Sequence, residues 1–500
     1  MRNNHVDRKL RYLTPFLCVP LLFWGCTDLE ETPFSVVQPD EFYLTEAQLL
    51  AAVIPVYANL RTYSWGETAH VGEAASDEIY VPTRGSDWFD AGNWQRLQEH
   101  TWTETDTKLK DSWLDAFRGI ARANVTLEAL ENSTSESDLL PAFKAETRFL
   151  RAFHYWWLLD LFGNVPIVTD ATPNPDNPPV QKTRQEVYDF IVSETIAALP
   201  DLKEEPALGR ASKGAANALL ATVYLNAEVY TGTAQWQKTI DACDAVINSG
   251  LYALLATHKD VFALENEGNV ENIFVVGHNP EGGVGLVRLM ATLHYSQLPS
   301  SPWNGFSVQA DFYNKFDSDD ARIDQLLIGQ QFILGGPAAG DSAFQRDGKP
   351  LFYTVDLGAF LQANESHGVR MLKWPVDRNA SGGDAGNDFA IFRYSHILLA
   401  KAEAKLMMGA DAEALTLVNL VRERNFDPDK PLAAITRELI LDERGFELLW
   451  ESFRRQDQIR TGRFDDAWAN KAASAEYRNL FPIPQTQMDA NPNLVQNTGY

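Results

Sequence analysis

The fold is decided most clearly by residues 146–162, which read ETRFLRAFHYWWLLDLF. At 3.6 residues per turn the large apolar side chains fall on two helical faces, one with Phe149, Phe153 and Trp156 and one with Leu150, Trp157 and Leu161. A helix that is apolar on two faces packs against neighbours on both sides. Gly163 and then Pro166 follow and end the helix. The stretch predicts a buried helix at the centre of a mainly α-helical protein.

Helix-start signals recur before and after this stretch. Thr45 and Gln48 form a capping box before an apolar run, and Thr183 and Glu186 form another. Ser212 opens a helix that runs to about Tyr230 and contains Ala215, Ala216, Ala218 and Ala221. Such small side chains let a partner helix approach closely. Helical periodicity returns later, over residues 389–408, 412–424 and 436–462.

Successive helix-turn-helix units predict a stack of helical hairpins, a tetratricopeptide-like superhelix, although no clean 34-residue repeat can be scored. Two segments interrupt the helical pattern. Residues 63–103 lose the period and are rich in aromatic residues, so they are expected to form a long loop. Residues 277–386 are broken repeatedly by Gly and Pro. We expect them to form a large irregular insertion of loops and short strands that packs on the stack rather than a separate domain.

The first 25 residues have the layout of an export signal. Four basic side chains precede a 13-residue apolar run, Tyr12 to Trp24, and Gly25 stands before Cys26. A small residue before a cysteine resembles the lipobox of bacterial lipoproteins, which predicts cleavage before Cys26 and lipid attachment to it. Ordinary cleavage that leaves Cys26 free is the alternative. The only other cysteines, Cys18 and Cys243, offer no plausible disulfide framework, so lipid attachment is favoured.

The remaining chain is acidic. Removal of the signal takes away four of the 43 Lys and Arg residues and one of the 68 Asp and Glu residues, which leaves a net charge of −28. Such a chain repels nucleic acid, so no nucleic-acid partner is expected. Residues 26–41 are expected to be an acidic linker between the lipid and the body of the protein.

Several segments, taken in order, resemble the SusD/RagB family of outer-membrane nutrient-binding lipoproteins. They are residues 121–128, 146–166, 209–216, 393–403, 443–448 with Arg454, Asp457 and Arg460, and the end, 481–484 with 496–500. The resemblance divides the chain into a SusD-like N-terminal helical region, 42–250, and a RagB/SusD C-terminal region, 251–500, packed together as one unit. Arg444 and Glu447, or Asp457 and Arg460, lie three apart on a helix, so they are expected to pair with each other or with buried polar groups rather than with a ligand.

The resemblance also implies a function. Family members capture oligosaccharides at the cell surface and act as the lid of a TonB-dependent outer-membrane transporter of the SusC type. They carry ligand on aromatic side chains from an N-terminal loop and from the later irregular part, and they are not catalytic. For this chain it implies a protein anchored by lipid to the cell outer membrane and facing the exterior.

A glycan site needs flat aromatic rings beside planar polar groups, because a sugar has apolar C–H faces and a rim of hydroxyls. Residues 82–94 contain this mixture within 13 positions, and the candidate ligand contacts are Arg84, Asp87, Trp88, Asn93 and Trp94. Trp65, Trp303 and Trp374 are second candidates. No motif marks any of these residues, and a loop tryptophan often only fills a core.

Three other functions stay open at this point. A glycan-cleaving enzyme would need two carboxylates at a set separation, which 67 acidic residues could supply. A helical-repeat scaffold would bind only proteins, and a different nutrient, such as peptide, could replace the glycan. No cofactor or metal is expected, since Asp317 to Asp320 lack the glycine and final glutamate of an EF-hand and are expected to form a solvated turn.

Overall fold

The computed structural model describes residues 43–279, 281, 285–378 and 385–500. The predicted signal peptide, Cys26 and the linker lie outside the described residues. The part from Tyr43 to Tyr500 is one compact unit. None of the helices formed by the described residues combines the length and the apolar character needed to cross a bilayer.

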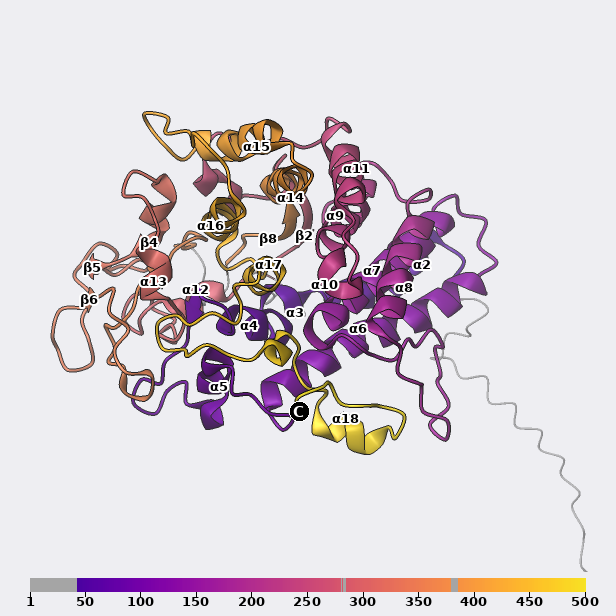
Figure 1. Ribbon diagram of the computed structural model, residues 1–500, viewed down its shortest axis with the longest axis horizontal. Helices are drawn as coiled ribbons and strands as arrows, with labels where there is room; N and C mark the ends of the chain where they lie inside the picture. The colour runs from indigo at the N-terminus through magenta and orange to yellow at the C-terminus, as the bar shows by residue number, and fades with distance from the viewer. Residues whose placement is uncertain (1–42, 280, 282–284, 379–384) are drawn as a thin grey trace, which may run out of the picture. The chain divides into compact units, whose positions relative to one another are not determined.

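The fold is mainly helical, as the sequence predicts (Figure 1). The α-helices are α2 (Glu46–Ala58), α3 (Arg61–Ser64), α4 (Glu67–Ala74), α5 (Asn93–Glu99), α6 (Thr107–Glu131), α7 (Leu140–Phe162), α8 (Arg184–Ala198), α9 (Lys213–Leu225), α10 (Ala227–Thr231), α11 (Trp236–Ile247), α12 (Arg288–Thr292), α13 (Ala310–Tyr313), α14 (Tyr394–Met407), α15 (Asp411–Glu423), α16 (Arg437–Leu448), α17 (Arg454–Thr461) and α18 (Gln485–Ala490).

The long helices pack as a series of hairpins. Helix α6 packs on α7, α7 on α8, α8 on α9, α9 on α11 and α11 on α14. The series continues from α14 to α15 and α16. Each helix therefore contacts mainly its neighbours in the series, which is the tetratricopeptide-like arrangement expected from the sequence.

Local signals set where these helices begin. The side chains of Thr45 and Thr183 each accept the backbone N–H three residues on, from Gln48 and Glu186, and both capping boxes are complete. Ser212 accepts from the backbone of Ala215 in the same way. All three predicted starts are confirmed, because a cap depends only on residues within one turn.

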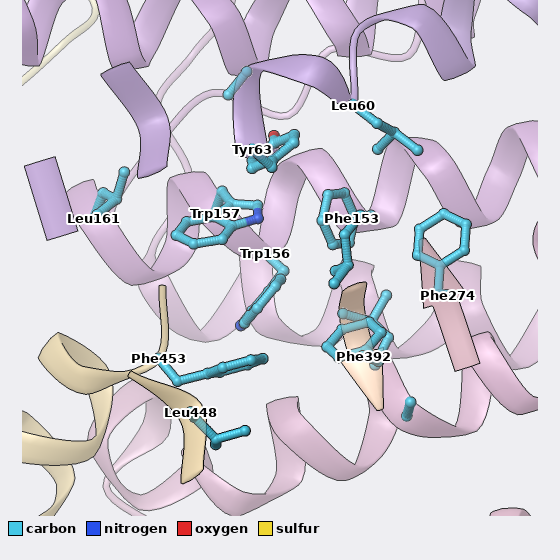
Figure 2. Packing of buried hydrophobic residues seen from close by; sticks show 14 of the residues in the cluster. Leu60, Tyr63, Phe153, Trp156, Trp157, Leu161, Phe274, Phe392, Leu448 and Phe453 are labelled. Carbon is cyan, nitrogen blue, oxygen red and sulfur yellow. The ribbon is translucent and has the colours of Figure 1, made fainter. Parts of the chain in front are cut away.

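Helix α7 is buried on two sides, as its pattern predicts (Figure 2). Trp157 stacks on Tyr63, with ring centroids 5.2 Å apart, while Trp156 faces Phe392 at 5.9 Å. Tyr63 belongs to the short helix α3 and Phe392 to a strand near the other end of the chain. The helix thus joins segments far apart in sequence into one core.

Four antiparallel strand pairs form among the described residues, and five of their eight short strands lie in the irregular insertion, as expected. They pair β1 (Ile79–Tyr80) with β3 (Ser307–Val308), β2 (Asn272–Val276) with β8 (Phe389–Arg393), β4 (Leu326–Leu327) with β7 (Arg370–Met371), and β5 (Gly329–Gln330) with β6 (Phe352–Tyr353). In the longest pair Val275 lies opposite Ala390. The loops that carry β4, β5 and β6 lie on the left in Figure 1, beside α12 and α13.

The prediction that residues 63–103 form one long loop is wrong. They contain the end of α3, all of α4 and all of α5. Helix α4 is buried at every residue from Thr68 to Ala74, so it has no polar face, and a helix without two distinct faces gives no periodic signal. Tertiary packing, not amphipathicity, forms these helices.

Buried ion pairs hold the C-terminal helices together. Asp457 accepts from Arg444 and from Arg460, each at 2.7 Å. Glu447 accepts from Arg393, Arg424 and Arg322. The expectation that these groups pair internally is confirmed, although Arg444 pairs with Asp457 rather than with Glu447.

Candidate functional site

Tryptophans from distant parts of the chain gather around Phe306. The Phe306 ring centroid lies 5.3 Å from Trp94, 5.5 Å from Trp88 and 6.0 Å from Trp65. Trp65 in turn lies 5.6 Å from Trp303. The fold therefore brings four of the five predicted tryptophans into one cluster, through contacts that span more than 200 residues of sequence.

The outer side of this cluster is an open pocket, which we call the aromatic site. It has a volume of about 380 Å³ and is lined by Asp87, Trp88, Asp90, Tyr295, Ser301, Pro302 and Trp303. Trp303 is 37% exposed, so part of its ring is open to solvent. The site presents aromatic faces and carboxylates to solvent together.

The backbone on both sides of the aromatic site is strained. Trp88, Asp90 and Ala91 have φ angles of 62°, 40° and 52°, and across the site Ser301 and Asn304 have 54° and 51°. Positive φ in residues other than glycine persists only where surrounding contacts enforce it, and such residues cluster at ligand-binding sites. The strain therefore supports a binding role for this pocket.

Trp88 is fixed by two contacts. Its indole Nε1 donates to the carbonyl oxygen of Trp303 at 2.7 Å, which joins the two sides of the site. Its ring also lies directly over Gly305, where an added Cβ would be only 2.2 Å from Trp88 Cε2. Only glycine at position 305 allows this approach.

A polar rim surrounds the rings. Asp87 accepts from the hydroxyl of Tyr295 and, at 3.2 Å, from Arg346. The Arg346 guanidinium lies 4.2 Å from the Tyr295 ring centroid and also donates to Glu365. Arg346 thus connects its own loop with the loops that contain Asp87, Tyr295 and Glu365.

Burial shifts the pKa values of two side chains near the rim, His294 and Tyr295. His294 Nε2 donates to the Glu365 carboxylate at 3.1 Å, and burial lowers the pKa of His294 to about 4. The imidazole is therefore neutral at physiological pH. Burial raises the pKa of Tyr295, and the adjacent Asp87 raises it further, so the phenol remains a hydrogen-bond donor.

The eight sequence candidates inside the described residues fall into two groups. Asp87, Trp88 and Trp303 line the aromatic site, and Trp65 lies half-buried behind Trp303. The other four, Arg84, Asn93, Trp94 and Trp374, are buried. Their side chains have almost no surface that a ligand could contact.

Each buried candidate has a structural partner instead. Arg84 donates to Ser307 Oγ at 2.9 Å, and Asn93 donates to the Asp90 carbonyl at 2.6 Å. Trp94 donates to Asp90 Oδ2 at 2.7 Å. Asn93 and Trp94 begin helix α5 rather than lying in a loop, and Trp374 contacts the core through Trp450 at 5.7 Å.

Sequence reasoning missed Tyr295, Arg346 and Glu365, because no local pattern connects them with residue 88.

The acidic segment at Asp317 also differs from expectation. Asp317 and Asp319 pair with Lys430 at the surface, but Asp320 is buried and binds Arg322 at 2.7 Å. In the part of the chain that the structure describes, no group of three or more His, Cys, Asp or Glu side chains is placed to hold a metal ion.

The fold and the site define a helical-repeat protein with an open pocket of aromatic and acidic side chains in its loop-rich part. Two family profiles match the chain. Residues 278–500 match the profile described as the SusD family, and residues 38–225 match one described as starch-binding associating with outer membrane. The chain belongs to the SusD/RagB family.

Individual relatives agree with this assignment. The starch-binding protein SusD of Bacteroides thetaiotaomicron is 26% identical over 463 residues, which cover 83% of this chain and 82% of that protein. A SusD superfamily protein from Parabacteroides distasonis has a TM-score of 0.76 at 22% identity, covering 91% of this chain and all of that one. A surface glycan-binding protein from B. thetaiotaomicron, solved with laminarihexaose, has a TM-score of 0.72 at 21% identity, covering 90% and 99% of the two chains. The two solved structures share the fold of this chain.

Proposed function

We propose that the protein binds an oligosaccharide at the aromatic site without cleaving it. The observation that carries the proposal is that the exposed Trp303 and the half-buried Trp88 and Tyr295 line one open pocket beside the carboxylates of Asp87 and Asp90. Aromatic faces stack on the apolar faces of sugar rings, and carboxylates accept hydrogen bonds from their hydroxyls. The match to a starch-binding relative supports the same chemistry.

The expected affinity is modest. If each ring covers about 60–80 Å² of apolar sugar surface, one stack contributes about 1.5–2 kcal/mol. Two or three stacks with hydrogen bonds, less the cost of association, give a Kd in the micromolar to millimolar range. Weak binding suits a protein that must release its ligand to the next component.

We further propose that the protein is held by lipid on Cys26 at the outer face of the outer membrane and passes its ligand to a TonB-dependent transporter of the SusC type. The export signal, the cysteine after Gly25 and the family membership support this arrangement. Several acyl chains on one cysteine would make the attachment stable.

Binding of the purified domain, residues 27–500, to plant, host and microbial oligosaccharides tests the proposal, with product formation measured in the same samples. Binding without products is expected. Turnover of any glycan would overturn it, and binding of peptides alone, or of no small ligand, would favour the other functions.

The substitution Trp303→Ala tests whether the glycan binds in the aromatic site. Loss of one stack should weaken binding about 10- to 30-fold. Phe352→Ala is the matched control, because Phe352 is also an exposed aromatic, at 54%, but does not line the pocket. Equal effects of the two substitutions would contradict the assignment.

A further inference from the structure

The charged groups that face the aromatic site are both acidic. Among its lining residues only Asp87 and Asp90 carry charge, and their side chains are 36% and 47% exposed. The remaining lining is aromatic or neutral. A ligand in the pocket therefore meets carboxylates, and a neutral sugar can donate its hydroxyls to them, whereas a sulfate or carboxylate group cannot.

The cations near the rim are already engaged. Arg346 is 58% exposed but is bound by both Asp87 and Glu365. Lys108 is only 10% exposed, and its Nζ lies 3.1 Å from Glu67 and 3.6 Å from Asp90. The positive charge of each side chain is therefore balanced by two carboxylates before any ligand arrives.

Two further arginines lie beneath the site but cannot reach a ligand. Arg84 and Arg370 are 2% and 0% exposed. Both donate to Ser307 Oγ, and Arg370 also donates to Asn304 and to the carbonyl of Glu365. Their charges partly offset the carboxylates at longer range, so discrimination between ligands must arise from direct contact at the rim.

We propose that the aromatic site selects uncharged glycans over sulfated or uronic-acid glycans, and that Asp87 sets this selectivity by occupying Arg346. The proposal rests on the glycan-binding function argued above and defines its ligand class. Asp87 acts in two ways, because it repels an anionic group directly and withdraws the one exposed cation of the rim. If the charge of Asp87 is removed, Glu365 is the carboxylate that remains paired with Arg346. One N–H group of the Arg346 guanidinium then turns toward the pocket.

The test compares paired probes that share a glycan backbone and differ in whether they carry anionic groups. Maltoheptaose, laminarihexaose and methyl-esterified oligogalacturonate are neutral, and their partners are the sulfated forms of the first two and the free oligogalacturonate. At moderate ionic strength, each neutral probe that binds should bind about tenfold or more tightly than its charged partner. Equal or tighter binding of the charged partners overturns the selectivity while leaving glycan binding intact. Failure of all probes and of the wider panel would instead overturn the proposed function itself.

Variants separate the role of Asp87 from that of net charge. Asp87→Asn should improve binding of the charged probe relative to its neutral partner by at least about threefold, and the additional change Arg346→Met should abolish that gain. Asp347→Asn removes the same charge from the neighbouring turn, where Asp347 pairs with Lys349, and should leave the ratio unchanged. An unchanged ratio in Asp87→Asn, with an unaltered thermal midpoint showing that it folds, overturns the role of Asp87.

Discussion

Gly305→Ala should displace Trp88 and weaken both folding and binding. The new Cβ would lie 2.2 Å from Cε2, 2.5 Å from Cζ2 and 2.7 Å from Cδ2 of the Trp88 indole. Carbon atoms in contact ordinarily stay about 3.5–4 Å apart, so the ring must retreat by more than about 1 Å. The retreat also breaks the 2.7 Å hydrogen bond from Trp88 to the Trp303 carbonyl.

The size of both effects follows from these contacts. Overpacking costs about 1–3 kcal/mol and the lost hydrogen bond about 1 kcal/mol, which together lower the free energy of unfolding by about 2–4 kcal/mol. In a protein of this size that corresponds to a fall of about 2–4 °C in the thermal midpoint. Loss of the Trp88 face should weaken glycan binding about 10- to 30-fold.

Calorimetry of melting and of glycan binding measures the two effects, with two comparison variants. Gly72→Ala makes the same change inside α4, where an added Cβ meets nothing within 4 Å. It should leave glycan binding unchanged and raise the free energy of unfolding by about 0.5–1 kcal/mol, because Ala is favoured over Gly in a helix interior. In a Trp88→Ala background, Gly305→Ala should no longer destabilise, because the clashing ring is absent. If Gly305→Ala behaved like Gly72→Ala, or still destabilised without Trp88, the described position of Trp88 would be wrong.

Three further outcomes are expected. Asp457→Asn leaves two buried arginines, Arg444 and Arg460, without their shared carboxylate. It should lower the free energy of unfolding, measured by chemical denaturation, by about 3–5 kcal/mol. An unchanged denaturation midpoint would refute the role of this cluster. Burial raises the pKa of Glu73 to about 7 in the folded protein, whereas the unfolded chain releases this proton near pH 4.5. Wild-type stability should therefore fall as the pH rises from about 4.5 to about 7. Glu73→Gln should therefore gain stability relative to wild type between pH 5 and 8 in thermal melts, and a constant difference across this range would count against the argument. Cys26→Ala should release the protein from the membrane fraction while leaving glycan binding intact, and its retention there would contradict lipid attachment at this residue.

Much of the helical framework could be predicted from sequence because its signals are local. The capping residues Thr45, Thr183 and Ser212 act on backbone groups within one turn, and the two apolar faces of residues 146–162 reflect the period of a helix. Helix α4 escaped prediction because it is buried on every side. Composition also indicated a mixture of aromatic and polar side chains in residues 82–94, but it could not separate Asp87 and Trp88, which line the aromatic site, from Arg84, Asn93 and Trp94, which are buried.

What the sequence determined by itself, then, was a mainly α protein built of helical hairpins, with an aromatic segment suited to sugar. Only the tertiary structure decided which aromatic residues form a site. Trp88 and Trp303 meet across 215 residues of sequence, and Trp374, with the same chemistry, is buried in the core. The exposure of a tryptophan depends on what packs over it, and those neighbours come from other parts of the chain, so no local pattern distinguishes a tryptophan that binds ligand from one that fills the core.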